Sequence, residues 1–261
     1  MPVLAVIPAR LGATRLLRKP LRLLAGLPLV VRVYQRVVLL EVADHCVVAT
    51  DSDDVATVCT SHGIPVELTR PEHPSGTDRV AEVADRAPFR GFDIVLNVQG
   101  DEPFVLRAAL AGAVSVVTDG RAEIGTAAVV TGRPILDRPD IVKVVCDDAG
   151  RALYFSRAPI PFLREASEAH LQDAVVRQHV GVYAYSRDAL QQWVRWPPHP
   201  LELIERLEQL RPLAHGLSIG VADVEVAEGG IDTEEDLAHA NARWARHDTA
   251  QASPTMIREI D

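Results

Sequence analysis

Basic side chains are concentrated in one short segment near the start of the chain. Arg10, Arg15, Arg18 and Lys19 lie within ten positions and follow the apolar run Val3–Ala9. The run predicts a buried strand of a parallel sheet, and open α/β sheets bind their ligands beyond the carboxyl ends of such strands. Cations crowded at this place favour a small anionic ligand. From charge alone, a solvated basic loop is an equally good interpretation.

Carboxylates follow another apolar run, Asp93–Val98, in the segment Gln99-Gly100-Asp101-Glu102-Pro103. Mg²⁺ is commonly held in proteins by one or two carboxylates together with substrate phosphates. If Asp101 lies at the rim that carries the basic segment, the pair suits phosphoryl or nucleotidyl transfer, in which positioning and charge neutralisation do most of the work. The alternative interpretation is a β-turn with Gly100 at positive φ and Asp101 as a cap.

A second acid, Asp232, precedes the last predicted helix. A carboxylate at that place is more often an N-cap than a metal ligand, although one carboxylate can do both. His179 and Arg157 lie among apolar neighbours and by default are satisfied core or edge residues. The absence of GxxxxGK[ST] and GxGxxG motifs excludes P-loop and dinucleotide-binding proteins. The residues alone therefore predict an α/β protein that binds a phosphorylated small molecule with Mg²⁺.

The composition is that of an ordinary globular protein. The 261 residues are 48% hydrophobic and 24% charged, which allows one large α/β domain. The net charge of −9 argues against a nucleic-acid or membrane-surface partner. Cys46, Cys59 and Cys146 show no CxxC spacing, which argues against a zinc site and a disulfide framework. No apolar run has the length of a signal-peptide core or a membrane span, so we expect a cytoplasmic protein.

Apolar patterns predict strands and helices that alternate through the first half of the chain and a mixed arrangement in the second half. The predicted class is α/β, with a mostly parallel, partly mixed central sheet flanked by helices. After the first strand, strands are expected at His45–Asp51, Val66–Thr69, Asp93–Val98, Gly125–Thr131, Ile141–Asp147, Ala152–Ser156, Gln178–Tyr185 and Leu217–Val226. Helices are expected at Leu29–Leu40, Val55–His62, Asp78–Arg86, Leu106–Thr118, Leu201–Leu213 and Asp232 to about Arg246, with 159–176 irregular.

Several segments, in the same order along the chain, resemble the 3-deoxy-manno-octulosonate (Kdo) cytidylyltransferases, a family of sugar nucleotidyltransferases. The resemblance extends from Pro2 to about Leu237. Its early motifs are shared with related nucleotidyltransferases, and the last ones are more particular to the Kdo enzymes. The segments are Ile7-Pro8-Ala9-Arg10, Thr14-Arg15-Leu16, Lys19-Pro20-Leu21, Val48-Ala49-Thr50-Asp51, Ser75-Gly76-Thr77-Asp78-Arg79, Val98-Gln99-Gly100-Asp101-Glu102-Pro103, Ala152-Leu153-Tyr154-Phe155-Ser156-Arg157, His179-Val180-Gly181-Val182-Tyr183, Leu207-Glu208-Gln209-Leu210-Arg211 and Ile231-Asp232-Thr233.

The resemblance implies transfer of CMP from CTP to the anomeric hydroxyl of Kdo, with release of pyrophosphate, in lipopolysaccharide synthesis. It implies a nucleotide-diphospho-sugar transferase-like fold and Mg²⁺ as cofactor, the metal lowering the pKa of the sugar hydroxyl. No side-chain base is evident, and Arg157 suits the Kdo carboxylate because its guanidinium fork matches it. By position, the implied roles are nucleotide binding for Ala9, Arg10, Arg15, Lys19, Ser75, Gly76 and Arg79, catalysis for Arg10, Lys19 and Asp101, metal binding for Asp101 and Asp232, and sugar-acid binding for Gln99, Arg157, His179, Tyr183 and Glu208.

The resemblance also implies a homodimer whose interface lies around Pro159 to Pro200. We expect one nucleotidyltransferase domain at 1–246. Within it, about 1–130 forms the nucleotide-binding part and about 155–200 forms the sugar-acid and dimerisation part, a small module. Residues 247–261 are expected to be a flexible tail.

One pair of residues departs from the family pattern. The family usually has Pro-Gly before the lysine of the basic segment, and this chain has Leu17-Arg18. Glycine permits positive φ, so its loss either misplaces Lys19 and weakens CTP binding or is offset by the charge of Arg18. Three hypotheses therefore stay open: an enzyme acting on Kdo, the same chemistry on another sugar acid such as 8-amino-Kdo, and a degenerate paralogue that binds nucleotide or a partner protein without turnover.

Overall fold

The computed structural model describes residues 1–12 and 15–251. Ala13 and Thr14 of the basic segment, and residues 252–261 of the expected tail, lie outside this range. The strands are β1 (Val3–Ala9), β2 (Leu23–Leu24), β3 (Leu27–Pro28), β4 (His45–Thr50), β5 (Val66–Leu68), β6 (Ile94–Asn97), β7 (Ile124–Val130), β8 (Lys143–Cys146), β9 (Ala152–Ser156), β10 (Arg177–Ser186) and β11 (Ile219–Asp223).

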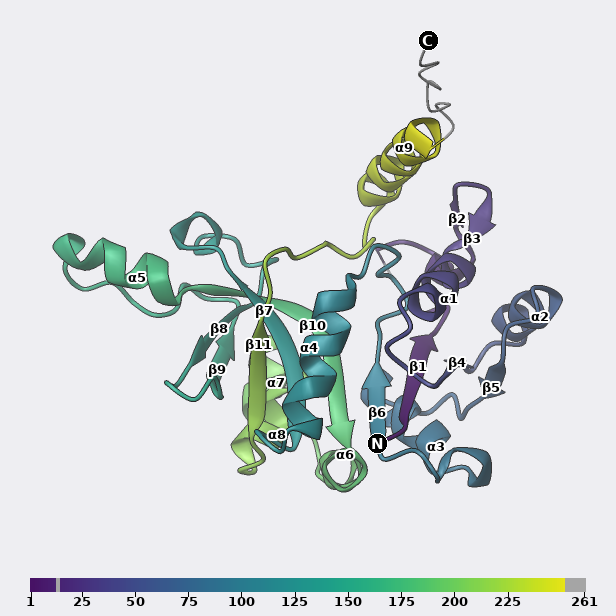
Figure 1. Cartoon of the computed structure of the whole chain (residues 1–261), viewed down its shortest axis with the longest axis horizontal. Coiled ribbons are helices and arrows are strands. Elements are labelled where there is room, and N and C mark those ends of the chain that lie inside the picture. Colours follow the sequence, from purple (N-terminus) through teal and green to yellow (C-terminus); the bar gives the residue numbers. More distant parts are fainter. Residues whose placement is uncertain (13–14, 252–261) are drawn as a thin grey trace, which may run out of the picture.

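Nine of the described strands form one mixed sheet in the order β11-β7-β10-β6-β1-β4-β5, to which β8 and β9 are added alongside β10 (Figure 1). Strands β5, β4, β1 and β6 pair in parallel, as do β7 and β11. Strand β10 runs antiparallel to β6, β7 and β8. The predicted α/β class with a partly mixed sheet is confirmed.

Helices cover both faces of the sheet, because the central strands are buried on both sides. In β1, Ala5 and Ile7 belong to a core formed with α1, α2 and α4, whereas Leu4 and Val6 belong to a second core formed with α3 and α6. Alternate side chains of a strand point to opposite faces, so an unbroken apolar run fits this place. The helices are α1 (Leu29–Leu39), α2 (Asp53–Ser61), α3 (Gly76–Ala84), α4 (Arg107–Thr118), α5 (Ala169–Val175), α6 (Arg187–Arg195), α7 (Pro200–Glu205), α8 (Leu210–Ala214) and α9 (Glu234–Gln251).

Several regions differ from the sequence-based expectation, which did not include α6 or the β2–β3 pair. The single helix expected at Leu201–Leu213 is wrong, because α7 ends at Glu205, its C-cap Arg206 is left-handed, and α8 begins only at Leu210. The segment 159–176, expected to be irregular, contains α5. Helix α9 continues to Gln251, beyond the expected end near Arg246. Among the described residues, no helix combines the length and the apolar character needed to cross a membrane.

Candidate active site

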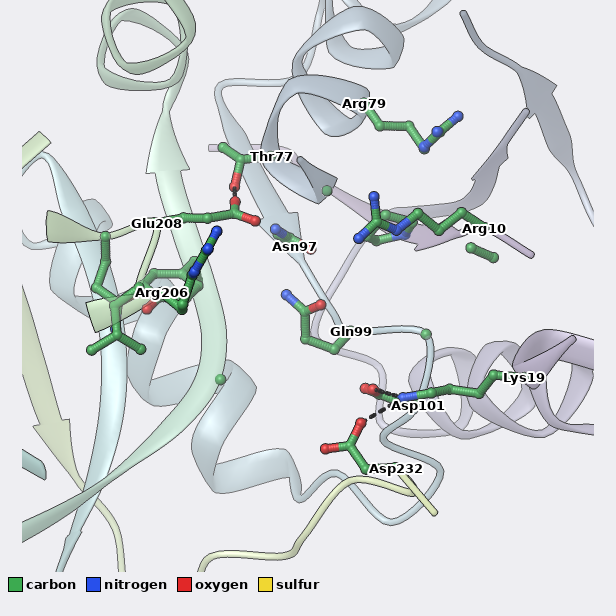
Figure 2. Close-up of a pocket in the computed structure, with 18 of the residues that line it drawn as sticks. Arg10, Lys19, Thr77, Arg79, Asn97, Gln99, Asp101, Arg206, Glu208 and Asp232 are labelled. Carbon is green, nitrogen blue, oxygen red and sulfur yellow. Dashed lines mark hydrogen bonds and ion pairs between the residues drawn. The ribbon is translucent and has the colours of Figure 1, made fainter. Parts of the chain in front are cut away.

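A pocket of about 550 Å³ opens at the carboxyl ends of β1 and β6 (Figure 2). The register of the sheet explains the place: β1 and β6 are parallel neighbours, and antiparallel β10 brings Tyr183 opposite Asn97. Of the sequence-predicted site residues, only Ser75 is absent from the pocket lining. The others are brought together there: Ala9, Arg10, Arg15, Lys19, Gly76, Arg79, Gln99, Asp101, Arg157, His179, Tyr183, Glu208 and Asp232.

Two carboxylates converge on one ammonium group at the mouth of β6. Lys19 Nζ donates to Asp101 Oδ2 at 2.6 Å and to Asp232 Oδ1 at 2.8 Å. Burial lowers the pKa of Lys19, but Coulomb attraction and hydrogen bonds from the two acids outweigh burial and leave it above the ordinary value. Arg15 Nη2 lies 3.1 Å from Asp232 Oδ2. The prediction that acids and basic segment share one rim is therefore confirmed.

Backbone contacts bring the two acids together from distant parts of the chain. Ile231 N donates to the carbonyl oxygen of Asp101 at 2.9 Å, which fixes the segment before Asp232 against the loop after β6. A Cβ atom on Gly100 would lie 2.7 Å from the carbonyl oxygen of Pro8, so glycine is required for this close approach. Glu102 N donates to the carbonyl oxygen of Gln99 at 3.3 Å, so the β-turn of the alternative interpretation is present, but the φ of Gly100 is not positive and that part of it is wrong.

The N-cap interpretation of Asp232 is also wrong, because the following residue supplies the cap. Thr233 Oγ1 accepts from Asp236 N at 3.1 Å, and the Asp236 carboxylate accepts from Asp232 N at 3.0 Å and Thr233 N at 2.9 Å. This reciprocal pattern is a capping box. The carboxylate of Asp232 is thereby left to the pocket.

The carboxylates of Asp101 and Asp232 fit a magnesium ion whose remaining ligands come from the substrate and water. Among the described residues, no group of three or more His, Cys, Asp or Glu side chains is placed to hold a metal ion. Asp101 and Asp232 nevertheless direct one oxygen each at a single cationic atom, Lys19 Nζ. Two carboxylates with substrate phosphates and water are an ordinary Mg²⁺ environment.

Arg18 adopts the conformation that the glycine of the family pattern would favour. Its φ of 54° and ψ of 34° are left-handed, and the 3₁₀ turn Lys19–Leu21 follows it directly. Its guanidinium donates to Asp54 Oδ2 at 2.8 Å, outside the pocket lining. Lys19 still reaches both acids, so the departure at Leu17-Arg18 leaves this side chain in the pocket. The charge of Arg18 is directed to α2 instead.

The loop before α3 forms one wall of the pocket. Ser75 is the N-cap of α3, accepting from Asp78 N at 3.3 Å and donating to Asp78 Oδ2 at 2.6 Å. Arg79 is 2% exposed, and its guanidinium donates to Asp51 Oδ2 at 2.8 Å and to Thr69 Oγ1. Ser75 therefore does not line the pocket but holds the loop before α3 in place. Arg79 holds the same wall in place through Asp51 and Thr69.

The opposite end of the pocket is lined by groups with strongly shifted pKa values. Burial lowers the pKa of His179 to about 3, so its imidazole is neutral at pH 7 and lies 2.9 Å from Thr126 Oγ1. Burial raises the pKa of Tyr183 well above its usual value. Burial also raises the pKa of Glu208, which accepts from Thr77 Oγ1 at 2.8 Å. Buried side chains that donate and accept hydrogen bonds in this way suit a polyhydroxylated ligand.

Arg157 lines the pocket with two of its guanidinium donors engaged by backbone carbonyls. Its Nε donates to the carbonyl oxygen of Glu205 and its Nη1 to that of Pro139, both at 3.0 Å. Its backbone N donates to Glu205 Oε2 at 2.9 Å. Backbone carbonyls thus hold the guanidinium in place, and three of its five N–H donors remain for a ligand, so the proposed contact with a sugar-acid carboxylate stays a prediction.

Asn97 and Arg206 are two of the lining residues that the sequence-based set did not include. Asn97 ends β6 with its side chain buried. Its Nδ2 donates to Tyr185 Oη at 3.3 Å, while its Oδ1 has no hydrogen-bond partner among the described residues. The sequence could have indicated Asn97, because it is a polar residue at the end of an apolar strand. Arg206 lines the pocket from the break between α7 and α8. No signal pointed to it, because a left-handed residue is usually glycine or asparagine.

Comparison with known proteins agrees with this geometry. A family model described as cytidylyltransferase matches residues 4–219. The chain is 73% identical over 244 residues to a 3-deoxy-manno-octulosonate cytidylyltransferase of Gemmatimonas aurantiaca, covering 94% of this chain and 95% of the relative. It is 46% identical to the enzyme of that name from Leptothrix cholodnii, covering 89% and 88%.

A solved structure is similar over nearly the whole fold. It is a CMP:2-keto-3-deoxy-manno-octonic acid synthetase complexed with CTP, with a TM-score of 0.87 and 35% sequence identity, and the match covers 95% of this chain and 100% of the other. The family model and the relatives each cover well over half of the chain. The chain therefore belongs to the cytidylyltransferase family, among the 3-deoxy-manno-octulosonate cytidylyltransferases.

Proposed function

We propose that the protein transfers CMP from CTP to the anomeric hydroxyl of Kdo, forming CMP-Kdo and pyrophosphate. The observation that carries the proposal is the 73% identity to a named Kdo cytidylyltransferase over almost the full length of both chains. The CTP complex of the structurally similar synthetase supports CTP as the donor. CMP-Kdo would then serve lipopolysaccharide synthesis, and the free cysteines are in keeping with a reducing cytoplasm.

The residues divide the pocket between the two substrates. Arg10, Arg15 and Lys19 lie at the end of β1 and supply positive charge for the triphosphate, and the wall that contains Gly76 and Arg79 lies along the cytidine. The sugar hydroxyl attacks the α-phosphorus, the bond to pyrophosphate breaks, and the hydroxyl proton is released. Side chains on rigid strands hold both reactants in line, which is the larger part of catalysis in this class of reaction.

Asp101 and Asp232 would hold Mg²⁺ together with oxygens of the triphosphate. When bound, the ion would neutralise phosphate charge and lower the pKa of a nearby hydroxyl. Lys19 is now hydrogen-bonded to both acids and would pair with the phosphates once the metal neutralises those acids. Dependence on Mg²⁺ is checked by turnover in the presence of a chelator, which we expect to abolish product formation.

We also propose that the protein is a homodimer. Apolar side chains are exposed on the arm that extends from β10 and carries α5 (Figure 1): Phe162 is 85%, Leu171 56% and Val175 42% exposed. Exposed apolar side chains gathered on one arm are typical of an interface. We expect light scattering to give the mass of a dimer and Phe162→Asp to give a monomer. A wild-type monomer would contradict the proposal.

One assay tests the reaction and its acceptor. The purified protein is incubated with CTP, Mg²⁺ and either Kdo, 8-amino-Kdo or sialic acid, and pyrophosphate is measured. We expect release with Kdo. Faster release with 8-amino-Kdo would favour the alternative acceptor, and no release with any acid would favour the non-catalytic paralogue.

A further inference from the structure

Arg206 is held in an unusual backbone conformation at the wall of the pocket. Its φ of 56° and ψ of 46° are left-handed, a conformation that disfavours side chains with a Cβ atom. The side chain is exposed and lines the pocket, and Figure 2 shows its guanidinium directed toward the space between Glu208 and Gln99. Strained residues of this kind cluster at ligand sites.

The chain on both sides of Arg206 is tied down. The Glu205 carboxylate accepts from Ser156 Oγ at 2.6 Å, and Glu208 accepts from Thr77 Oγ1 at 2.8 Å. Across the break, Arg211 forms a buried ion pair with Glu202 at 2.5 Å. The backbone that carries Arg206 is therefore fixed, and a fixed backbone lowers the entropy lost when its side chain binds a ligand.

Four of the other cations that line the pocket already have partners, and Arg10 lies at the end of β1. Lys19 and Arg15 pair with the two acids, Arg79 pairs with Asp51, and Arg157 donates to backbone carbonyls. The backbone N of Arg206 donates to the carbonyl oxygen of Glu202, but its guanidinium forms no hydrogen bond or ion pair with any residue that the structure describes. It is thus a cation available to a ligand at the end of the pocket that holds His179, Tyr183 and Glu208.

An anionic acceptor needs such a group. Glu208, Asp101 and Asp232 all line the pocket, and a sugar acid brings a further carboxylate toward them. Without a cation, that charge is repelled and loses its hydration. We infer that Arg206 binds the carboxylate of the sugar-acid acceptor and selects acceptors that carry one. The inference deepens the proposed function and rests on it.

The test uses Arg206→Gln, with KM measured for both substrates by pyrophosphate release. We expect KM for Kdo to rise about tenfold and KM for CTP to change less than about twofold, since one charged hydrogen-bond partner is lost at the acceptor end only. The carboxamide of Kdo supplies a second readout. The wild type should prefer Kdo to its amide by about tenfold, and Arg206→Gln should lose that preference.

Two further variants separate this role from folding. Arg195→Gln removes an exposed arginine of α6 outside the pocket and should leave both KM values unchanged. Arg206→Gly relieves the backbone strain, so it should stay folded and still raise KM for Kdo. Unchanged KM for Kdo in both Arg206 variants, or an undiminished preference over the amide, overturns the inference.

Failure of the proposed function would appear differently, as absence of pyrophosphate release by the wild type. In that case calorimetric titration of the wild type and Arg206→Gln with Kdo decides the inference. We expect weaker binding by the variant, and equal heats in the two proteins overturn the role of Arg206.

Discussion

We expect the Arg18→Gly variant to be more stable than the Arg18→Ala variant. Both variants lose the ion pair with Asp54, in which each partner is 58% exposed, but only glycine relieves the left-handed backbone at φ 54°. Left-handed backbone costs a residue with a Cβ atom about 1–2 kcal/mol. The greater freedom of glycine in the unfolded chain offsets about 0.5–1 kcal/mol of this. The net difference is about 0.5–1 kcal/mol in favour of Arg18→Gly.

Thermal unfolding measures the difference. For a chain of this size we expect Arg18→Gly to melt about 1–4 °C above Arg18→Ala. Asp54→Ala removes the same ion pair and leaves Arg18 in place. The Asp54→Ala variant measures the contribution of the Arg18–Asp54 ion pair to the free energy of unfolding, which at this exposure is about 0.5 kcal/mol. If Arg18→Gly melted at or below Arg18→Ala, with circular dichroism unchanged, the strain assigned to this residue would be refuted.

Three further predictions concern the pocket and its supports. Asp101→Ala should reduce pyrophosphate release about 100-fold or more with unchanged circular dichroism, because Lys19 loses a hydrogen-bond acceptor and the proposed Mg²⁺ site loses one of its two carboxylates; near-wild-type turnover would show that Asp101 is not required. The pKa of His179, about 3 when folded, lies below its unfolded value, so only the unfolded chain gains a proton as pH falls below about 6.5. Stability should therefore fall by about 2 kcal/mol between pH 6.5 and 5, and His179→Gln should flatten this part of the urea-unfolding profile. Arg211→Ala should destabilise the fold by about 3–5 kcal/mol in the same assay, because it leaves Glu202 charged, buried and unpaired; a loss below about 1 kcal/mol would contradict this.

The sheet could be predicted because its strands coincide with apolar runs in the sequence. The run Val3–Ala9 has to be buried on both faces, and the rule that ligands bind beyond such strands placed the basic segment and Asp101 at one rim. Local chemistry was harder to assign. Thr233 and Asp232 are both good N-caps by type, and only the hydrogen bonds of Asp236 show which residue has that role.

The left-handed residues could not be found in advance, and they caused the largest error. Leu201–Leu213 has the apolar content of one helix, and nothing at Arg206 signals an end, since glycine is the usual signal. Tertiary contacts of Glu202 with Arg211 and of Glu208 with Thr77 stabilise the break. Arg18 is the same case in the opening loop, where comparison with the family pattern supplied the signal that local propensity lacks.

The contact between Lys19 and Asp232 joins residues 213 positions apart, and this has a consequence for biosynthesis. Strands β1, β4, β5 and β6 are complete once Asn97 has been translated, and Asp101, which contacts Lys19, follows shortly afterwards. Asp232 and its anchor Ile231 are synthesised more than a hundred residues later. A nascent or prematurely terminated chain can therefore bury much of the nucleotide half while lacking one of its two acids. The pair of acids that we propose as the metal site is therefore completed only late in synthesis.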